Sequence, residues 1–342
     1  MGDILHALPA VTALRQVHPE WVIDWVAEPR WQALFTAEDS LGRVTSQPLL
    51  NRLFFAPTRE WRKAPLSSAT LKEIKLLRLA LRATVYDAVL DLQGAIRSAV
   101  IGRLAHCPRL IGEDAPRERP ASWLFTERVV TRGAHVIEQD VELASAVAGD
   151  DLKPATPWLP IDPAAEAWAD GILTPDSKQR TVLINPGAGW GAKRWPTERY
   201  AAVAQGFIDR GCRVLVNAGP GEERLADAIV RSTAGATALS VTLSQLVALT
   251  RRIALCVAGD TGPLHLACAL GRPVVGIYGP TDPSRNGPFG TRFRVLRSPE
   301  SRRDHTRHAA PEAGLLTIQP EDVLRVADEL AAEEAHSPVT HL

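Results

Sequence analysis

The sequence predicts an α/β protein of two domains, each built around a mainly parallel β-sheet. The chain of 342 residues is longer than one hydrophobic core usually accommodates, so two domains are expected. Short β-branched runs alternate with helical patterns, most clearly in the C-terminal half. This alternation indicates βαβ units with helices on both faces of a sheet. A proline-rich segment at residues 152–163 disfavours regular structure and predicts a linker between the halves.

The C-terminal half has the clearer order of elements. Strands are expected at 181–185, 213–217, 253–258 and 273–278, with helices at 197–209, 222–232, 243–252, 263–270 and 320–334. Glycines and prolines follow the strands, at the edge where open α/β sheets bind ligands. We place the domain boundary near residue 165, which gives an N-terminal domain of residues 1–164 and a C-terminal domain of residues 165–334.

The N-terminal half shows the same alternation more weakly. Strands are expected at 21–26 and 88–92, with helices at 8–17 and 71–83. A doubly wound domain opens with a strand that leads into its first helix, and the chain shows no such strand. We therefore expect that a strand and turn of about 10 residues precede Met1 and that the start was assigned at an internal methionine.

The bulk composition excludes several classes of protein. Lysine plus arginine and aspartate plus glutamate both number 39, so net charge provides no general attraction to nucleic acid or membranes. The four cysteines lack metal-ligand spacing and are expected to be reduced thiols. The chain contains neither a long apolar run nor a signal-peptide pattern, so a cytosolic protein without a membrane span is expected.

A first candidate site follows the expected strand at 253–258. Asp260, Thr261 and Gly262 come directly after it, and Pro263 suits the first position of a helix. The free N–H groups of such a helix end favour phosphate, with Thr261 as a hydroxyl donor and His265 one turn further on. The alternative, an ordinary helix N-cap, has about equal weight for this segment alone.

Two further loops follow strands of the same half. The segment 187–196 is rich in glycine and carries Lys193, which could neutralise a departing diphosphate, although a solvated basic loop is the simpler alternative. Its spacing does not match a P-loop. After the next strand, Glu222 or Glu223 could accept hydrogen bonds from ribose hydroxyls, or could simply favour a helix start.

The N-terminal half contributes basic residues and one carboxylate. Arginine suits phosphate or carboxylate recognition, although any single surface arginine more often serves solubility. The basic residues considered are Arg52, Arg59, Arg62, Lys63, Arg97, Arg117 and Arg119. Asp3, expected in the turn before the first helix, could act as general base for an acceptor hydroxyl or as a helix N-cap.

Five segments together resemble the heptosyltransferases of lipopolysaccharide core synthesis, glycosyltransferase family 9. In chain order they are Met1–Ala10, Asp91–Gly94, Lys193–Pro196, Gly259–Ala267 and Tyr278–Pro283. Each segment is weakly specific by itself, whereas five in the correct order over nearly the whole chain are strongly specific.

The resemblance implies a GT-B fold: two Rossmann-like, doubly wound domains that face each other across a cleft, here without the first N-terminal strand. It implies inverting transfer of L-glycero-D-manno-heptose from ADP-heptose, with no metal and no other cofactor. Asp3 then matches the base and Lys193 the lysine near the diphosphate. The donor-site positions are matched by Asp260, Thr261, Gly262 and His265, and by Glu222 in preference to Glu223 for the ribose.

Within the family, the basic stretch around Trp61 resembles heptosyltransferase I, which acts on Kdo2-lipid A at the inner face of the inner membrane. Arg59, Arg62 and Lys63 match its acceptor-binding run, and Arg117 an acceptor-side arginine; Gln139 stands where a basic residue is expected. The alternatives are heptosyltransferase II, another family member with a different acceptor, and a non-catalytic nucleotide-binding Rossmann protein. No GxGxxG segment follows a strand, which disfavours an oxidoreductase.

Overall fold

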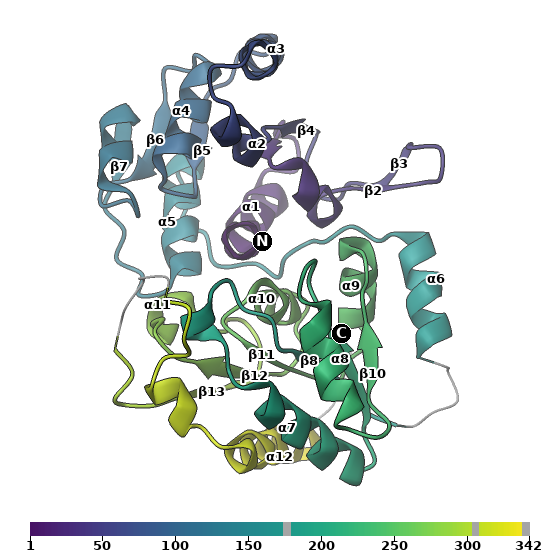
Figure 1. The fold of residues 1–342 in the computed structure, drawn as a ribbon. Helices are drawn as coiled ribbons and strands as arrows, with labels where there is room; N and C mark the ends of the chain where they lie inside the picture. The colour runs from purple at the N-terminus through teal and green to yellow at the C-terminus, as the bar shows by residue number, and fades with distance from the viewer. Residues whose placement is uncertain (174–178, 303–307, 337–342) are drawn as a thin grey trace. The chain divides into compact units, whose positions relative to one another are not determined.

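The computed structural model describes residues 1–173, 179–302 and 308–336, which form two compact units (Figure 1). The first unit contains Asp3–Asp162, and the second begins at Pro163. Residues 150–162 are without helix or strand, whereas Pro163 begins helix α6 (Pro163–Ile172) rather than ending a linker. Proline is favourable in a first helical turn because the N–H group that it lacks would have no partner there.

The second unit is built on one parallel sheet. Its strands, in spatial order, are β10 (Thr237–Leu239), β9 (Arg213–Asn217), β8 (Thr181–Asn185), β11 (Leu255–Gly259), β12 (Val274–Tyr278) and β13 (Phe293–Arg297). Within this sheet, the first strand in sequence is the central β8, and the next two, β9 and β10, lie successively further out on one side. The chain then crosses to β11 on the other side of β8. This is the 3-2-1-4-5-6 order of a Rossmann fold, whose ligand-binding switch point lies between β8 and β11.

Helices cover both faces of this sheet, as Figure 1 shows. One face carries α7 (Thr197–Asp209), α8 (Glu223–Arg231) and α12 (Pro320–His336), and the other carries α9 (Leu243–Thr250) and α10 (Gly262–Ala269). Every residue of β8, β11 and β12 is buried, as expected for strands covered on both sides. In the main core, Trp195 packs edge-on against Tyr200 with ring centroids 4.9 Å apart.

The first unit has shorter strands and a divided sheet. Strand β1 (Asp24–Ala27) pairs with β4 (Arg52–Phe55), whereas β5 (Val89–Asp91), β6 (Leu110–Glu113) and β7 (Glu127–Val129) form a separate parallel sheet. The hairpin of β2 (Ala37–Glu38) and β3 (Val44–Ser46) is antiparallel. The helices are α1 (Gly2–Val17), α2 (Thr58–Lys63), α3 (Ser68–Arg82), α4 (Ile96–Leu104) and α5 (Val136–Ala148).

Helix α1 corrects one expectation. It begins at Gly2, since the N–H groups of Ile4 and Leu5 both donate to the carbonyl of Met1 at 3.1 Å. Asp3 therefore lies in the first helical turn, and its placement in a turn before the helix is wrong. A carboxylate there is favoured by the positive end of the helix dipole.

The described residues contain four free cysteines, of which Cys107, Cys256 and Cys268 are buried. Among the helices of the described ranges, none is both long and apolar enough to cross a membrane.

Candidate functional site

The switch point of the second unit brings Lys193 and Asp260 together. Lys193 lies at the end of the loop after β8, in the short helix η3 (Gly191–Lys193), and Asp260 directly follows β11. Because β8 and β11 are neighbours, their carboxyl ends place the two residues side by side although 67 positions separate them in sequence. The Lys193 Nζ and Asp260 Oδ2 atoms form an ion pair, and each side chain is only 11% exposed.

Asp260 has a second partner in His265. The His265 Nε2 atom lies 3.2 Å from Asp260 Oδ1, and the His265 side chain is 6% exposed. Burial acts to raise the pKa of the Asp260 carboxyl, but the hydrogen bond with His265 and the charge of Lys193 outweigh it and hold that pKa well below its usual value. The carboxylate is therefore ionised at neutral pH, and it holds Lys193 in place.

Lys193 also lies over an aromatic ring. Its Nζ atom is 4.2 Å from the centroid of the Trp190 ring, a distance at which a cation is attracted to the ring face. Asp260 and Trp190 thus position the Lys193 ammonium from two directions, so that little rearrangement is needed for it to meet a phosphate oxygen. Sequence analysis did not select Trp190, although its place three residues before Lys193 in a glycine-rich loop is a signal for such a contact.

Helix α10 begins beside this pair. Thr261 is its N-cap residue, but the Thr261 hydroxyl donates to the carbonyl of Gly259 at 3.2 Å, and no side chain caps the helix. The alternative of an ordinary helix N-cap is thus correct for the position of Thr261, but the side-chain hydrogen bond of such a cap is not formed. An uncapped helix start with Gly262 at its first position lets an anion approach the backbone N–H groups closely.

Glu222 joins the same edge from the loop after β9. Its Oε1 atom accepts a hydrogen bond from the N–H of Ala188 at 3.1 Å, so it crosses to the loop after β8. A Cβ on Gly187 would lie 2.0 Å from Glu222 Oε2, and glycine there is what permits this approach. Glu223 instead accepts from the N–H of Gly221 at 3.0 Å. Of the two glutamates, Glu222 is thus the one that lies against the glycine-rich loop.

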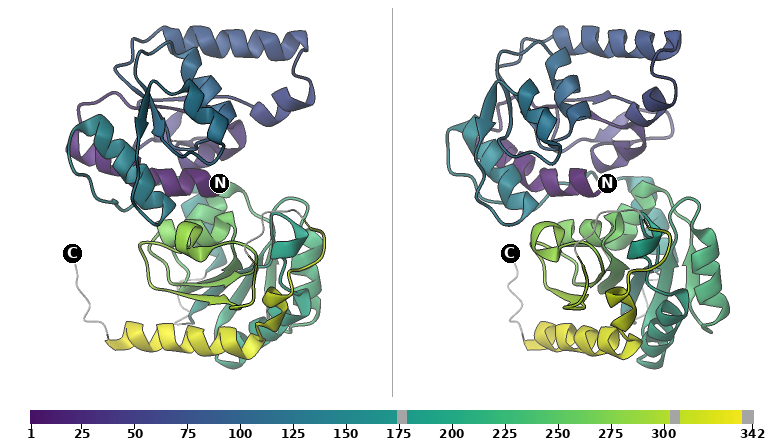
Figure 2. Two further views of the ribbon diagram at one scale, coloured as in Figure 1. Left: turned by 90° about the vertical axis from the view of Figure 1, so that its left-hand side faces the viewer. Right: turned by 60° about the vertical axis from the view of Figure 1, so that its left-hand side comes forward.

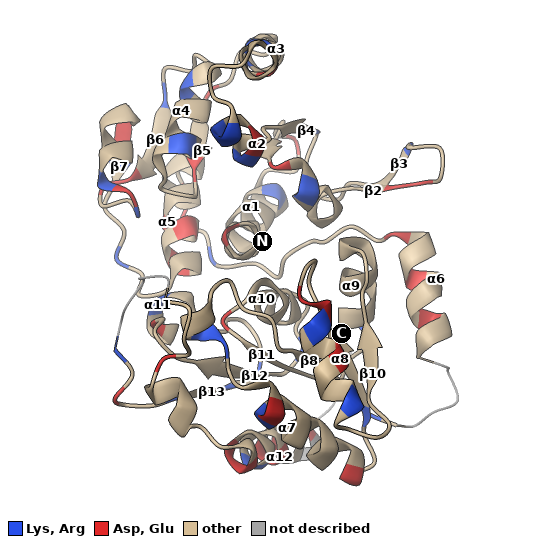
Figure 3. Ribbon diagram, in the orientation of Figure 1, with Lys and Arg blue, Asp and Glu red and all other residues tan. Residues whose placement is uncertain are grey.

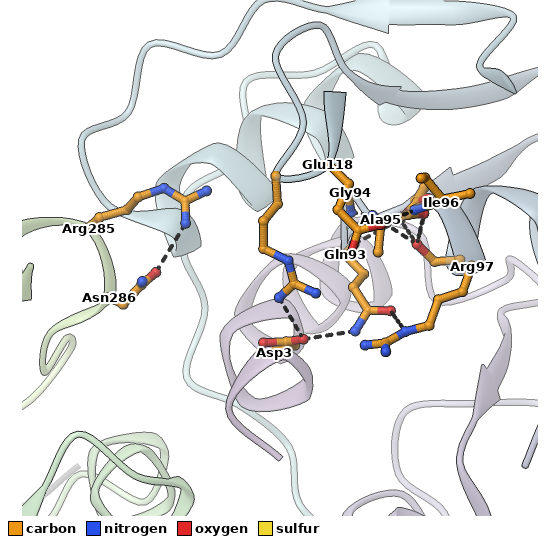
Figure 4. Close-up of polar contacts among 12 residues, drawn as sticks. Asp3, Gln93, Gly94, Ala95, Ile96, Arg97, Glu118, Arg285 and Asn286 are labelled. Atoms are coloured by element: carbon orange, nitrogen blue, oxygen red, sulfur yellow. Dashed lines mark hydrogen bonds and ion pairs between the residues drawn. The ribbon is translucent and has the colours of Figure 1, made fainter. Parts of the chain in front are cut away.

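In the first unit, Asp91 organises the loop that faces Asp3. Asp91 ends β5, and its Oδ1 atom accepts from the N–H groups of Gln93 and Gly94 at 2.9 and 3.0 Å. Gly94 adopts a φ of 60°, a left-handed conformation that glycine permits. The resulting turn directs the Gln93 side chain toward α1, as Figure 4 shows.

The Asp3 carboxylate accepts hydrogen bonds from Gln93 and Arg117. Its Oδ2 atom accepts from Gln93 Nε2 at 2.8 Å and from Arg117 Nη1 at 3.3 Å. Gln93 is in turn contacted by Arg97, whose Nε atom lies 3.4 Å from Gln93 Oε1 (Figure 4). Desolvation raises the pKa of Asp3, but the Gln93 hydrogen bond and the Arg117 charge prevail, and the pKa lies below its usual value. Asp3 is therefore ionised at neutral pH.

The basic residues Arg59, Arg62 and Lys63 lie on the short helix α2, where Figure 3 shows Lys and Arg in blue. Glu28 holds the start of this helix by accepting from the N–H of Arg59 at 3.1 Å. Arg59 and Arg62 are exposed, and Lys63 pairs with Glu60 at 2.8 Å. The structure thus joins Asp3 to Arg117 directly and places Arg59, Arg62 and Lys63 together on α2.

Arg30 is a residue that sequence analysis missed. It lies in the helix η1 (Pro29–Leu34), and its pKa is lowered by burial and by the charges of Arg59 and Arg97, against the opposing effect of Glu28. Arg30 Nε lies 3.7 Å from Glu28 Oε2, and the charges of Arg59 and Arg97, from two other segments, act on Arg30 as well. An excess of positive charge at this place favours an anionic group. An isolated arginine after Pro29 carries no signal for this, whereas Gln93 lies in the recognised segment Asp91–Gly94.

Neither the residues around Lys193 and Asp260 nor those around Asp3 have the composition of a metal site. Within the described ranges, no cluster of three or more His, Cys, Asp or Glu side chains is arranged to hold a metal ion. The chemically distinctive features are a buried lysine beside an uncapped helix start in one unit and an ionised carboxylate beside clustered arginines in the other.

Known proteins are similar to this chain in sequence and in fold. A family model described as glycosyltransferase family 9 (heptosyltransferase) matches residues 74–315. Lipopolysaccharide heptosyltransferase 1 of Escherichia coli K12 is 31% identical over 307 residues, covering 87% of this chain and 91% of that protein. Lipopolysaccharide heptosyltransferase 2 of the same organism is 28% identical, covering 98% and 97% of the two chains.

A solved structure extends the likeness to the whole architecture. The Escherichia coli heptosyltransferase WaaC with ADP superposes with a TM-score of 0.77 at 28% identity, covering 96% of this chain and 97% of that one. The sheet order of the second unit agrees with a Rossmann-like domain of that GT-B architecture. The chain therefore belongs to glycosyltransferase family 9, the heptosyltransferases, and is a glycosyltransferase with a GT-B fold.

Proposed function

We propose that this enzyme is a heptosyltransferase I, which transfers L-glycero-D-manno-heptose from ADP-heptose to the Kdo2-lipid A core of lipopolysaccharide. The observation that supports an acidic acceptor is the positive charge of Arg30, Arg59 and Arg97 in the unit that holds Asp3, against which Glu28 sets one carboxylate, 3.7 Å from Arg30. Three arginines beside one glutamate leave an excess of positive charge that suits an acidic ligand, and the Kdo sugars carry carboxylates. The first unit is then the acceptor-binding domain.

The second unit is the donor-binding domain in this proposal. ADP lies at the switch point with Glu222 accepting from the ribose hydroxyls, while Thr261 and Gly262 offer backbone N–H groups to the diphosphate. Lys193, paired with Asp260, is the cation that meets a phosphate oxygen. His265 holds Asp260 in position and Asp260 orients Lys193, so these two serve the donor site through the lysine.

The chemical step is a single inverting displacement. Asp3 accepts the proton of an acceptor hydroxyl as that oxygen forms a bond to the anomeric carbon of the heptose. The bond from that carbon to the diphosphate oxygen breaks, and ADP leaves with the electron pair. Lys193 and the start of α10 stabilise the charge that develops on the leaving group, a task that requires neither a metal ion nor another cofactor.

The proposed acceptor also implies a location. Kdo2-lipid A is a lipid of the inner membrane, so we propose a cytoplasmic enzyme that acts at the inner face of that membrane. Arg62, Lys63 and Arg117 complete the positive surface that would meet the acidic head of the acceptor.

Acceptor profiling tests this function. With ADP-heptose in the presence of EDTA, the purified enzyme should transfer heptose to Kdo2-lipid A and should be inactive on a core that already carries one heptose. Mass spectrometry of the product checks both acceptors in one assay. Transfer to the monoheptosylated core alone would assign the chain to heptosyltransferase II, and a loss of transfer caused by EDTA would contradict the metal-free mechanism.

A glycine substitution tests the donor site. Gly187→Ala places a Cβ 2.0 Å from Glu222 Oε2 and forces that carboxylate to move. Since a hydrogen bond to a charged group contributes about 1.5–3 kcal/mol, ADP affinity should fall by roughly 10- to 100-fold. Isothermal titration with ADP measures the change. Gly189→Ala is the matched control, because its Cβ would have no neighbour within 4 Å. If the two variants bind ADP with equal affinity, Glu222 does not contribute to ADP binding.

A further inference from the structure

Helix α3 and the residues at its two ends present an apolar surface to solvent. The large side chains on it are Leu66, Leu71, Leu76, Leu79 and Val85, which are 86%, 53%, 54%, 56% and 95% exposed. In Figure 2 the helix lies along the outer end of the first unit, with one side uncovered. We call the outward side chains of residues 66–85 the α3 surface. Exposed leucines and a valine gathered along one helix and its two ends, rather than scattered singly, indicate an interaction surface.

The inner side of the same helix packs against the rest of the first unit. Thr70, Leu77 and Leu81 are buried, and the two leucines pack with Ala56 and the partly buried Trp61. These buried positions recur at helical spacing on one side, so the outward leucines point away from the core of the unit. The exposed apolar side chains are not members of that core cluster, so packing of the core does not account for their outward position.

Four of the five charged side chains of α3 are positive. Lys72, Lys75, Arg78 and Arg82 are exposed, and among the described residues none of them forms an ion pair with a carboxylate. The one acidic residue of the helix is Glu73, whose Oε2 atom accepts from the indole N–H of Trp61 at 2.7 Å. The α3 surface thus combines apolar side chains with uncompensated cations.

We propose that the α3 surface binds an anionic lipid bilayer and holds the enzyme at the membrane. A helix with leucines and basic residues on its exposed side lies in the plane of the bilayer interface, with leucines inserted among the acyl chains and cations at the lipid phosphates. The inference rests on the proposed function in one respect: a membrane lipid as acceptor gives the enzyme a reason to bind there.

The α3 surface is connected to the candidate acceptor residues. Trp61 of α2 donates to Glu73 of α3, and the Thr70 hydroxyl donates to the carbonyl of Ala64 at 2.9 Å. These bonds fix α2, which carries Arg59, Arg62 and Lys63, against the start of α3. A bilayer bound to α3 would therefore lie close to the basic run that we assign to the acidic head of the acceptor.

Charge favours a lipid surface over a second copy of this chain. Two α3 surfaces face to face would bring four cations of one molecule against four of the other, which disfavours association. Anionic lipid phosphates compensate those cations, and each lysine or arginine near such a membrane strengthens binding by roughly fivefold, or about 1 kcal/mol.

Cosedimentation of the full-length protein with vesicles tests this inference. Wild-type protein should bind vesicles of phosphatidylethanolamine and phosphatidylglycerol more tightly than vesicles of phosphatidylcholine alone, and added salt should weaken the binding. K72Q/K75Q/R78Q should reduce affinity on the order of 100-fold, the product of three roughly fivefold losses. L76S/L79S should reduce it about tenfold, because two half-exposed leucines no longer enter the bilayer.

The matched control is L41S/V44S, which alters two exposed apolar residues in and beside the β2–β3 hairpin, 75% and 54% exposed, and should bind like wild type. Thermal unfolding of each variant verifies its fold. Equal binding of wild type and both α3 variants, or equal binding to neutral and anionic vesicles, would overturn the inference. So would a wild-type dimer that forms without lipid and dissociates in L76S/L79S.

Activity separates this inference from the proposed function. On a deacylated, water-soluble Kdo2 acceptor the α3 variants should retain wild-type turnover, whereas on acceptor in anionic vesicles they should be slower. If the wild type transfers heptose to no Kdo acceptor, the proposed function is wrong. The membrane inference is then decided by the vesicle-binding assay alone. If transfer is normal and the α3 variants still bind vesicles fully, only the membrane inference fails.

Discussion

Replacing Asp3 by asparagine should lower kcat by about 10²- to 10⁴-fold, the usual contribution of a general base. The asparagine side chain keeps the shape and can still accept from Gln93, so the loop after β5 should hold its position. It cannot take the proton from the acceptor hydroxyl. The KM for an acidic acceptor should change little, since Arg30, Arg59 and Arg97 remain. Initial rates at saturating donor with varied acceptor separate the two parameters.

The pH dependence of the wild type gives a second measure of this residue. The hydrogen bond from Gln93 and the charge of Arg117 lower the pKa of Asp3, so the base stays ionised until the pH falls below its ordinary value of about 3.9. Measured kcat should therefore show no loss from Asp3 protonation between about pH 5 and 7.

Asp114→Asn provides a matched control for the Asp3 variant. Asp114 is another half-exposed aspartate of the first unit beside an arginine, 3.8 Å from Arg128, and it belongs to neither candidate site. It should leave kcat unchanged. Asp3→Asn with more than half of the wild-type kcat, at saturation with both substrates, would show that another group accepts the proton.

Replacing Lys193 by glutamine should lower kcat/KM by about 10²- to 10³-fold, because one preorganised charge contact with a developing anion contributes roughly 3–4 kcal/mol. The same change leaves the buried Asp260 carboxylate without its cation. Breaking a buried ion pair from one side typically costs about 3–5 kcal/mol of unfolding free energy, so this variant should also be less stable. Rate and thermal unfolding are therefore both measured.

The double variant K193Q/D260N separates the two effects. It removes both charges of the pair, so most of the lost stability should return, while the catalytic loss should remain since no cation meets the diphosphate. D260N alone should retain the lysine but place it less accurately, and an increase in the KM for donor is expected. Recovery of turnover in the double variant would show that Lys193 acts only to balance Asp260.

The sequence predicted the four inner strands of the second unit because their local signals agree with the tertiary structure, whereas the edge strands β10 and β13 were not predicted. Strands β8 and β9 and helix α7 have the bounds that the β-branched runs and helical patterns predicted. Strand β11 begins two residues later than expected, at Leu255. These strands are buried on both faces, so their residues are almost continuously apolar, and glycine or proline marks their ends.

The first unit was harder to predict for a physical reason. Its strands β5 and β7 have only three residues each, too few for an alternating pattern to be distinct from chance. β4, β6 and β7 were not among the predicted elements, and the parallel strands form two sheets instead of one. In such short strands, pairing with neighbours decides the structure more than local propensity does.

The sequence by itself determined the family, the alternation of strands and helices, and the segments that could bind a diphosphate. Those features depend on residue types close together in the chain, such as Asp260, Thr261 and Gly262 at the end of a strand. Only the tertiary structure decided that Lys193 pairs with Asp260, that Gln93 holds Asp3, and that α3 exposes leucines between cations. Strand order and packing bring distant residues within a few ångströms, and neither is encoded in the spacing of residues along one segment.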